Sequence, residues 1–227
     1  MELNDYCSIT NEQEERFKKY ESLLIEWNKK MNLTAITEHD EVILKHFVDS
    51  ISILKYINND CKIIDVGTGA GFPGIPIKIM NESVDVTLMD SLNKRINFLN
   101  EVITDLELKR IKAVHARAED LARNAEYRER FDFATSRAVA NLRTLLEYML
   151  PFVKVGGYCI CMKGPNVEEE IKMASKALKV LGGRIEKVDN LILPDSNIER
   201  NIIVIRKINK INLKYPRKAG VPAKEPI

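Results

Sequence analysis

The stretch Lys62-Ile63-Ile64-Asp65-Val66-Gly67-Thr68-Gly69-Ala70-Gly71-Phe72-Pro73-Gly74 decides the fold of this chain. Its apolar beginning predicts a buried strand, and the glycines that follow predict a tight turn into a helix. Glycines at such a turn let the backbone approach a ligand closely, and the next helix begins with unpaired N–H groups. The stretch therefore predicts a cofactor site at Gly67, Gly69 and Gly71.

The spacing of these glycines discriminates between cofactors. A dinucleotide-binding loop follows the pattern G-x-G-x-x-G, which would require a glycine at position 72. Phe72 occupies that position, and the third glycine comes one residue earlier, at Gly71. The resulting acid-x-Gly-x-Gly-x-Gly pattern resembles the first motif of the methyltransferases that use S-adenosylmethionine. In those enzymes the glycines pass under the ribose and the aminoacyl end of the cofactor.

From Cys61 onward, short apolar stretches alternate with helical segments such as Ser91–Leu106 and Val167–Leu181. The predicted strands are Lys62–Val66, Val84–Met89, Ile111–His115, Phe131–Thr135, Tyr158–Met162, Ile185–Leu193 and Asn201–Lys207. This alternation predicts an α/β fold in which helices cover both faces of a mostly parallel, seven-stranded, Rossmann-like sheet. No helix separates the last two strands, so we expect a hairpin and an antiparallel last strand, as in methyltransferase sheets.

An N-terminal helical extension precedes the sheet. Thr10 and Gln13 predict a capping box, and an apolar stripe of helical spacing follows at Phe17, Tyr20, Leu24, Trp27 and Met31. A second helical pattern runs from about Glu41 to Ile57. His46 and Asp49 lie off its apolar side, and His39 precedes it. We expect a surface or capping role for each of the three.

Composition sets the broad class of the protein. A chain of 227 residues, 45% hydrophobic and 30% charged, can bury one sizeable core. We divide it into a helical extension at residues 1–60, a methyltransferase core at 61–211 and a basic tail at 212–227, all within one structural domain. Without a long heptad pattern we expect a monomer, with no obligate protein partner.

The chain has no apolar run near the roughly 20 residues that span a bilayer, and no basic segment opens it as in a secretory signal. We therefore expect a cytoplasmic protein that does not engage membranes. The spacing of its four cysteines suits neither disulfides nor a zinc site, so no metal is expected. Cys159 and Cys161 are expected to share one face of a buried strand.

Ligands of open α/β sheets bind outside the carboxyl ends of the strands, so the residues there are site candidates. Asp90 ends the second strand, where its carboxylate could accept both ribose hydroxyls or cap the next helix. Ala118 and Glu119 follow the third strand, where they could flank an adenine or simply begin a short helix. Arg137 follows the fourth strand, where it could hold an anion or a base edge, or lie on the surface.

The segment after the fourth strand also narrows the acceptor. Thr135-Ser136-Arg137-Ala138 matches neither the Asp/Asn-Pro-Pro-aromatic motif of amino-group methylation nor the Pro-Cys nucleophile of pyrimidine-carbon methylation. A ring nitrogen such as guanine N7 needs neither device, because its lone pair is free and no proton must leave. Positioning would then supply most of the catalysis. The catalytic residues are unknown, with Arg137 and Lys163 as positioning candidates.

Basic charge gathers near the C-terminus. Between Arg200 and Ile227 there are eight Lys or Arg residues and one acid, Glu225. Such a segment attracts phosphates, although a solvated basic tail without a partner would have the same composition.

Six motifs together resemble the RsmG family, also called glucose-inhibited division protein B. They are Trp27-Asn28-Lys29-Lys30-Met31-Asn32-Leu33-Thr34, His46-Phe47-Val48-Asp49-Ser50, Asp65 to Pro76, Ser136-Arg137-Ala138, Met162-Lys163-Gly164 and Tyr215-Pro216-Arg217-Lys218-Ala219-Gly220. The resemblance covers nearly the whole chain. It implies an S-adenosylmethionine-dependent enzyme that methylates N7 of a guanine in bacterial 16S ribosomal RNA.

The resemblance also implies residue roles and partners. Cofactor contacts are implied at Gly67, Phe72, Ala118, Glu119 and Arg137. From their charge and location, the residues expected to line an RNA approach are Lys163, Arg217 and Lys218. The implied partner is 16S ribosomal RNA, presented as naked RNA, as an assembly intermediate or as the small subunit.

Two other classes of function remain to be separated from this one. A noncatalytic ribosome- or RNA-binding module could retain a vestigial nucleotide fold, although the intact glycines and Asp90 argue against it. A nicotinamide-dependent oxidoreductase is disfavoured by Phe72 and by the expected terminal hairpin. Binding of S-adenosylmethionine rather than NAD, and label transfer to RNA, would discriminate among the three.

Overall fold

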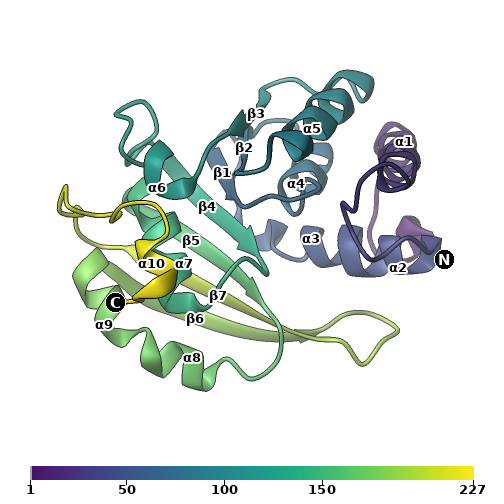
Figure 1. Ribbon diagram of the computed structural model, residues 1–227. Helices are drawn as coiled ribbons and strands as arrows, with labels where there is room; N and C mark the ends of the chain where they lie inside the picture. The colour runs from purple at the N-terminus through teal and green to yellow at the C-terminus, as the bar shows by residue number, and fades with distance from the viewer. Residues whose placement is uncertain (1) are drawn as a thin grey trace.

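A computed structural model describes residues 2–227 and contains one seven-stranded sheet with helices on both faces (Figure 1). The strands are β1 Lys62–Val66, β2 Asp85–Asp90, β3 Ile111–His115, β4 Phe131–Arg137, β5 Val153–Lys163, β6 Gly183–Ile192 and β7 Glu199–Lys207. Their order across the sheet is β3-β2-β1-β4-β5-β7-β6. All pairs from β3 to β5 are parallel, whereas β7 is antiparallel to both β5 and β6. The predicted α/β class, the strand count and the antiparallel last strand are confirmed.

Helices cover the two faces of the sheet in two groups. The α-helices are α1 Asn11–Asn28, α2 His39–Val42, α3 Asp49–Ile51, α4 Gly74–Met80, α5 Asn93–Asp105, α6 Ala118–Leu121, α7 Leu142–Met149, α8 Glu168–Met173, α9 Ser175–Leu181 and α10 Val221–Lys224. Helices α1, α4 and α5 pack together on one face, and α7 packs with α6, α8, α9 and α10 on the other. None of the helices within residues 2–227 is both long and apolar enough to cross a membrane.

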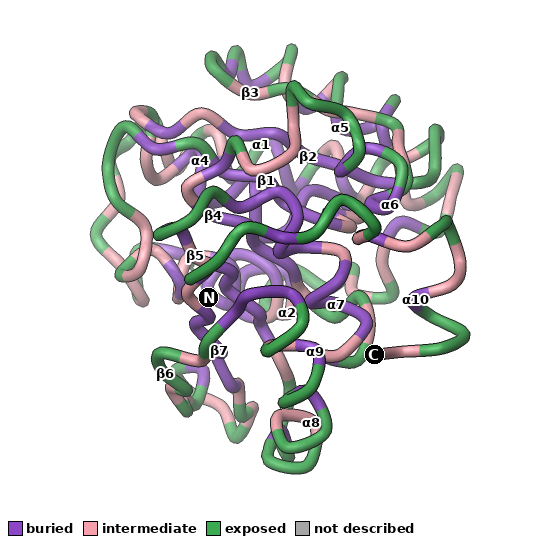
Figure 2. Tube along the Cα trace, turned by 90° about the vertical axis from the view of Figure 1, so that its left-hand side faces the viewer, coloured by how far each residue is buried: buried purple, intermediate pink, exposed green. Residues whose placement is uncertain are grey.

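The core lies on both sides of the central strands, which Figure 2 shows as buried. Ile63 and Ile64 of β1 are both fully buried, and their side chains join different hydrophobic clusters on opposite faces. Successive strand residues point to opposite faces, so burial of both requires cover on both sides. Cys159 and Cys161, two positions apart on β5, belong to one cluster, as expected.

The N-terminal extension packs on the first face. The predicted capping box is present, because the Thr10 hydroxyl accepts from the Gln13 amide and the Gln13 side chain accepts from the Thr10 amide. Phe17, Tyr20 and Leu24 of the stripe are buried against the sheet's helices, which confirms the stripe as core. The sheet's first face is therefore completed by residues that precede it in the chain.

Two of the helices predicted from the sequence are interrupted in the structure. The pattern from Glu41 to Ile57 forms α2, a π-helical turn at Ile43–Val48, and α3, followed by a separate 3₁₀ turn. A π turn closes i to i+5 hydrogen bonds, so the residues after it are rotated from their α-helical positions. The pattern from Val167 to Leu181 forms two helices, α8 and α9, that meet at Ala174. The periodicity identified both regions as helical but not these breaks.

Candidate functional site

The glycine turn after β1 forms the floor of the site. Gly67, Gly69 and Gly71 all have positive φ angles, of 70°, 62° and 103°, which favour glycine. A Cβ on Gly67 would lie 2.7 Å from the Val139 side chain, and one on Gly71 would lie 2.6 Å from the Tyr20 hydroxyl. A Cβ on Gly69 would meet no atom within 4 Å. The turn is thus closely packed at its two ends and open at its centre.

Asp65 stabilises the turn from below. Its fully buried carboxylate accepts hydrogen bonds from the Thr68 hydroxyl at 2.6 Å and from the Gly74 amide at 2.9 Å. Burial raises the pKa of Asp65 to about 6, although these hydrogen bonds oppose the shift. The acid of the motif therefore shapes the loop and does not line either cavity described below.

Asp90, at the end of β2, holds the centre of the turn. Its Oδ2 accepts from the Gly69 amide at 3.0 Å and lies 3.1 Å from the Arg95 guanidinium, and its Oδ1 accepts from the Leu92 amide. The sequence left a helix cap and a ribose contact open for this residue. The N-cap of α5 is Leu92, without a side-chain cap, so the Leu92 bond closes a turn before the helix and Asp90 does not cap it. Asp90 lines both cavities described below.

Two adjoining cavities lie at the carboxyl ends of the strands, as expected for an open sheet. The larger has a volume of about 680 Å³ and the smaller about 370 Å³, the range of small-molecule sites. They share the lining residues Gly67, Asp90, Ser91 and Val139. The larger cavity is walled by the N-terminal extension and the ends of β4, β5 and β7, and the smaller by α6, α7 and the C-terminal tail.

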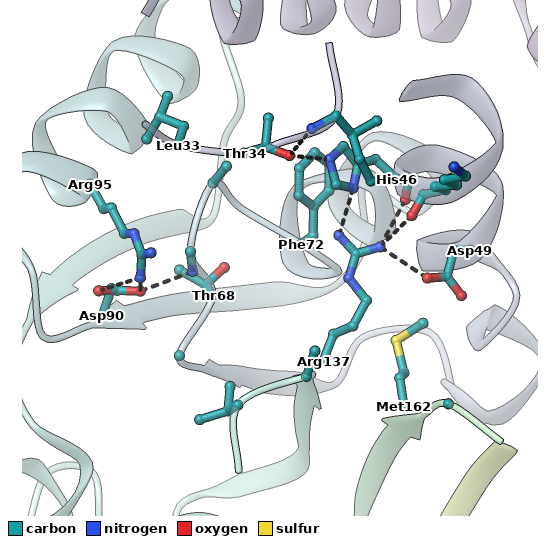
Figure 3. Close-up of a pocket in the computed structure, with 18 of the residues that line it drawn as sticks. Leu33, Thr34, His46, Asp49, Thr68, Phe72, Asp90, Arg95, Arg137 and Met162 are labelled. Atoms are coloured by element: carbon teal, nitrogen blue, oxygen red, sulfur yellow. Dashed lines mark hydrogen bonds and ion pairs between the residues drawn. The ribbon is translucent and has the colours of Figure 1, made fainter. Parts of the chain in front are cut away.

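Arg137 lies in the wall of the larger cavity (Figure 3). Its guanidinium lies over the Phe72 ring, 4.8 Å from the centroid, and donates to Asp49 Oδ2 at 3.2 Å and to the Lys45 carbonyl at 3.0 Å. It also lies 3.1 Å from Nδ1 of His46. Four partners thus fix the orientation of this arginine within the protein.

His46 connects Arg137 to the loop before α2. Its ring stacks on Phe72 with centroids 4.3 Å apart, and its Nε2 lies 2.9 Å from the Thr34 hydroxyl. Burial, with the adjacent Arg137 charge, lowers the pKa of His46 to about 3. The ring is therefore neutral, with Nδ1 accepting from the guanidinium and Nε2–H donating to Thr34. Thr34 also accepts from the Ile36 amide, which leaves its own hydroxyl proton for the cavity it lines.

Asp49 pairs with two arginines that are distant in sequence. Its carboxylate, 1% exposed, lies 3.2 Å from Arg137 and 3.1 Å from Nε of Arg200 on β7. The expectation of surface or capping roles for His46 and Asp49 is wrong, because the π turn directs both into the protein. His39 is exposed and begins α2, in line with its expected role. The sequence carries one signal for the pair, because His46 and Asp49 are three positions apart, a spacing that places two side chains on one side of a helix.

Ala118 and Glu119 line the smaller cavity, whereas His46, Asp49 and Arg137 line the larger one. Both begin α6, so the alternative that the sequence left open for Glu119, a helix start, also holds. The Glu119 side chain is buried, and its Oε1 accepts a hydrogen bond from the Gly220 amide at 2.9 Å. This contact joins the wall of the cavity to the C-terminal tail.

The three RNA candidates have different surroundings. Lys163 lines the larger cavity, and its Nζ donates to the Ala140 carbonyl and to Glu170. Arg217 makes a two-pronged ion pair with Glu147 of α7, at 2.7 to 3.1 Å. Lys218 is exposed. Lys163 thus shares the larger cavity with Gly67, Gly69, Phe72, Asp90 and Arg137, whereas Ala118 and Glu119 line the smaller cavity and Gly71 lines neither. The RNA contacts of Lys163, Arg217 and Lys218 stay predictions.

Comparison with known families gives one match over most of the chain. The family model described as GidB, rRNA small subunit methyltransferase G, matches residues 13–213. Curated relatives with the name "Ribosomal RNA small subunit methyltransferase G" include those of Desulforamulus reducens, 55% identical, and Alkaliphilus oremlandii, 54% identical. Each alignment spans 221 residues and covers 96% of this chain and 92% of the relative.

Solved structures with a similar fold are much more distant in sequence. A SAM-dependent methyltransferase from Aquifex aeolicus aligns with a TM-score of 0.55 at 20% identity, over 80% of this chain and 98% of that one. A precorrin-6y C5,15-methyltransferase from Geobacter metallireducens aligns with a TM-score of 0.51 at 14% identity, over 78% and 91%. These likenesses concern the fold alone, and they confirm the predicted Rossmann-like sheet.

Proposed function

The chain belongs to the rRNA small subunit methyltransferase G family, and from this premise we propose that it methylates N7 of a guanine in 16S ribosomal RNA, using S-adenosylmethionine. The observation that carries the proposal is the pair of joined cavities around the glycine turn, with Asp90 at the junction. The nicotinamide alternative lacks support in the family match. A noncatalytic module has no need of two cavities of ligand size.

The residues present fit S-adenosylmethionine. Asp90 offers two carboxylate oxygens at the junction of the cavities, which suits a pair of ribose hydroxyls. The smaller cavity, with Ala118 and Glu119, suits the adenine. The larger suits the aminoacyl end, with Gly67, Gly69 and Phe72 beneath it and Arg137 beside it. Gly71 lines neither cavity and contributes through the shape of the turn, where it packs against Tyr20. When bound, S-adenosylmethionine supplies a methyl group on a positively charged sulfur, which leaves as a neutral thioether.

The larger cavity also suits the approach of RNA. Five of the side chains that line it are basic and two are acidic: Lys45, Arg95, Arg137, Lys163 and Arg200, against Asp49 and Asp90. An excess of cations attracts the phosphate backbone, which fixes the register of a nucleic acid on a protein. We propose that Lys163 and Arg200 contact the RNA next to the target guanine.

Catalysis by positioning agrees with the chemistry of this wall. His46 is neutral and both its ring nitrogens are engaged, so it is not available as a general base. Methylation of N7 requires none, because the lone pair is free and no proton leaves. We propose that Arg137, held by Asp49 and His46, and the Thr34 hydroxyl orient the acceptor and the aminoacyl group for in-line transfer.

The form of the substrate follows from the same proposal. We infer that the protein acts as a monomer in the cytoplasm, on 16S ribosomal RNA presented as naked RNA, as an assembly intermediate or as the small subunit, since five basic side chains line its larger cavity. No obligate protein partner is proposed.

The test is label transfer from isotopically marked S-adenosylmethionine to unmethylated small subunits, with large-subunit RNA as the control. Mass spectrometry of the digested RNA is expected to find one labelled 7-methylguanosine. Label on an exocyclic amine or a pyrimidine would contradict the N7 assignment. Binding of S-adenosylhomocysteine without any transfer would favour the noncatalytic module, and calorimetric binding of NAD instead would favour the oxidoreductase.

A further inference from the structure

The tail that follows β7 returns to the smaller cavity. Gly220 and Ala223, from residues 212–227, stand in its lining beside Glu119 and Tyr148. The sequence match to the methyltransferase G family ends at residue 213, so Gly220 and Ala223 lie outside the matched region. Figure 1 shows the tail, in yellow, lying across α6 and α7. The tail is therefore a separate contributor to this cavity.

Buried polar contacts hold the tail in this position. Glu147 of α7, whose side chain is 1% exposed, accepts from the Arg217 backbone amide as well as from its guanidinium. The Thr144 hydroxyl donates to the Pro222 carbonyl at 3.1 Å, and Pro222 itself is buried. A solvated basic tail would have none of these contacts. Such a segment is a fixed part of the molecule.

Arginines of the core hold the beginning of the tail by its backbone. Arg123 donates to the Pro216 carbonyl at 2.6 Å, and Arg128 donates to the carbonyls of Tyr215 and Ile211. These contacts fix the path of the main chain whatever side chains it carries. The cations that contact the tail are thus directed at its carbonyl oxygens, and the cation of Arg217 is directed inward at Glu147.

Gly220 joins this segment to the candidate cofactor contact. Its amide donates to Glu119 Oε1 at 2.9 Å, and its φ of +84° is a left-handed conformation that favours glycine. No hydrogen bond between described residues involves the other carboxylate oxygen of Glu119, so Oε2 remains available to a ligand in the cavity. The tail thus orients the carboxylate and closes the cavity over it.

We propose that residues 212–227 form the outer wall of the nucleoside pocket, so that the tail serves cofactor binding and not RNA binding. In this role Gly220 positions Glu119, and Ala223 contacts the nucleoside. The inference rests on the proposed function, since it takes S-adenosylmethionine as the occupant. It reassigns Arg217 from an RNA contact to an anchor of the pocket wall.

Calorimetry with S-adenosylhomocysteine tests the wall directly. Ala223 is exposed on its outer edge, so Ala223→Phe is expected to leave the fold intact and to weaken binding about tenfold by filling the cavity. Lys224→Phe is the matched control, because Lys224 is exposed and does not line the cavity. It is expected to bind within twofold of the unmodified protein.

A second pair of variants separates the two roles of the tail. Arg217→Ala and Lys218→Ala each remove one positive charge, but only Arg217 is paired with Glu147. We expect Arg217→Ala to weaken S-adenosylhomocysteine about tenfold and Lys218→Ala to leave that affinity unchanged. Equal losses of RNA methylation in both variants, with cofactor affinity unchanged in both, would overturn the inference in favour of RNA binding.

The outcomes also separate this inference from the function on which it rests. If the unmodified protein does not bind S-adenosylhomocysteine, the proposed function fails. If it binds and Ala223→Phe binds equally tightly, the wall inference fails while the proposed function stands. Hydrogen exchange adds a readout independent of substitution, because the ligand is expected to slow exchange of the Gly220 amide at least tenfold. Unchanged exchange there on saturation would contradict the wall.

Discussion

The two ends of the chain both fold back on the glycine turn, but they contact the site with different chemistry. The N-terminal extension contributes side chains: the Tyr20 hydroxyl, the His46 ring and the Asp49 carboxylate. The tail contributes mainly backbone atoms, among them the Gly220 amide and the Pro222 carbonyl. We call the part of the extension that lines the larger cavity the N-terminal wall, and residues 212–227 the tail wall. Substitution of single residues should affect ligand binding strongly in the N-terminal wall, whereas in the tail wall it should matter mainly where it changes the path of the backbone.

The largest effect is expected in the turn that both walls enclose. Gly69→Asp places a side chain at a φ of +62° in the open centre of the turn, beside the Asp90 carboxylate. We expect affinity for S-adenosylhomocysteine to fall by at least about 100-fold, because the new carboxylate fills the cavity and repels Asp90. The left-handed conformation adds a destabilisation of about 1 kcal/mol. Undiminished calorimetric affinity would show that neither wall faces the ligand.

Two buried carboxylates allow the walls to be compared directly. Asp49 and Glu147 are each 1% exposed and each paired with arginine. Asp49 lies in the N-terminal extension, and Glu147 of α7 anchors the tail through Arg217. Asp49→Asn and Glu147→Gln are each expected to lower the unfolding free energy by about 3 kcal/mol, since each leaves a cation without its partner. Denaturant titration would measure this loss.

The same two variants should differ in function. Asp49→Asn is expected to slow methyl transfer more than tenfold with cofactor affinity within about threefold, because it frees Arg137 beside the acceptor. Glu147→Gln should mainly weaken cofactor affinity. If the two profiles were interchanged, the assignment of the walls would be reversed.

The N-terminal wall should also give stability a pH dependence of its own. The folded pKa of His46 is lowered to about 3 from 6.5, so the unfolded chain binds the proton between these values. The contribution of neutral His46 to the unfolding free energy is therefore fully present above pH 6.5, and it is lost as the pH falls towards 3. Between pH 7 and pH 4 the protein is expected to lose about 3 kcal/mol more than His46→Gln loses. The raised pKa of Asp65 acts in the opposite direction in both proteins, so it cancels from the difference.

The smallest effect is expected from a single hydroxyl of the same wall. Tyr20 donates to the Ala70 carbonyl at 2.5 Å, within the glycine turn. Tyr20→Phe keeps the ring and should cost about 1 kcal/mol of stability and roughly fivefold in cofactor affinity. Tyr158→Phe, on a ring that stacks on Phe133, is the control. Equal affinity in Tyr20→Phe would mean that the loop holds its shape without the extension.

Local pattern predicted the sheet well, because strands buried on both faces are short apolar runs bounded by turns. The same pattern predicted that Tyr20 is buried. It could not predict the acceptor of the Tyr20 hydroxyl, a carbonyl 50 residues away whose position depends on the tertiary fold. Side-chain burial follows from periodicity, whereas the partner of a polar group follows from packing.

The site residues also divide into those that local sequence pattern predicts and those whose contacts depend on tertiary packing. The sequence points to Asp90 and Arg137 because they follow strands, a position that topology brings to one edge of the sheet. It predicts surface positions for His46 and Asp49 because a π turn is not visible in a helical period. It predicts an RNA contact for Arg217 because charge in a tail suggests a polyanion, while the counter-charge, Glu147, lies 70 residues earlier in an apolar helix.

The double ion pair of Asp49 has a consequence for how this protein acquires its shape. It joins positions 88 and 151 residues apart, so it closes only after the first helices, the middle of the sheet and the final hairpin have met. Ring closures of this span are slow and entropically costly, while the strand–turn–helix around the glycines is local. We therefore expect Arg137 to reach its fixed orientation later in folding than the glycine loop, whose contacts are between near neighbours in the chain.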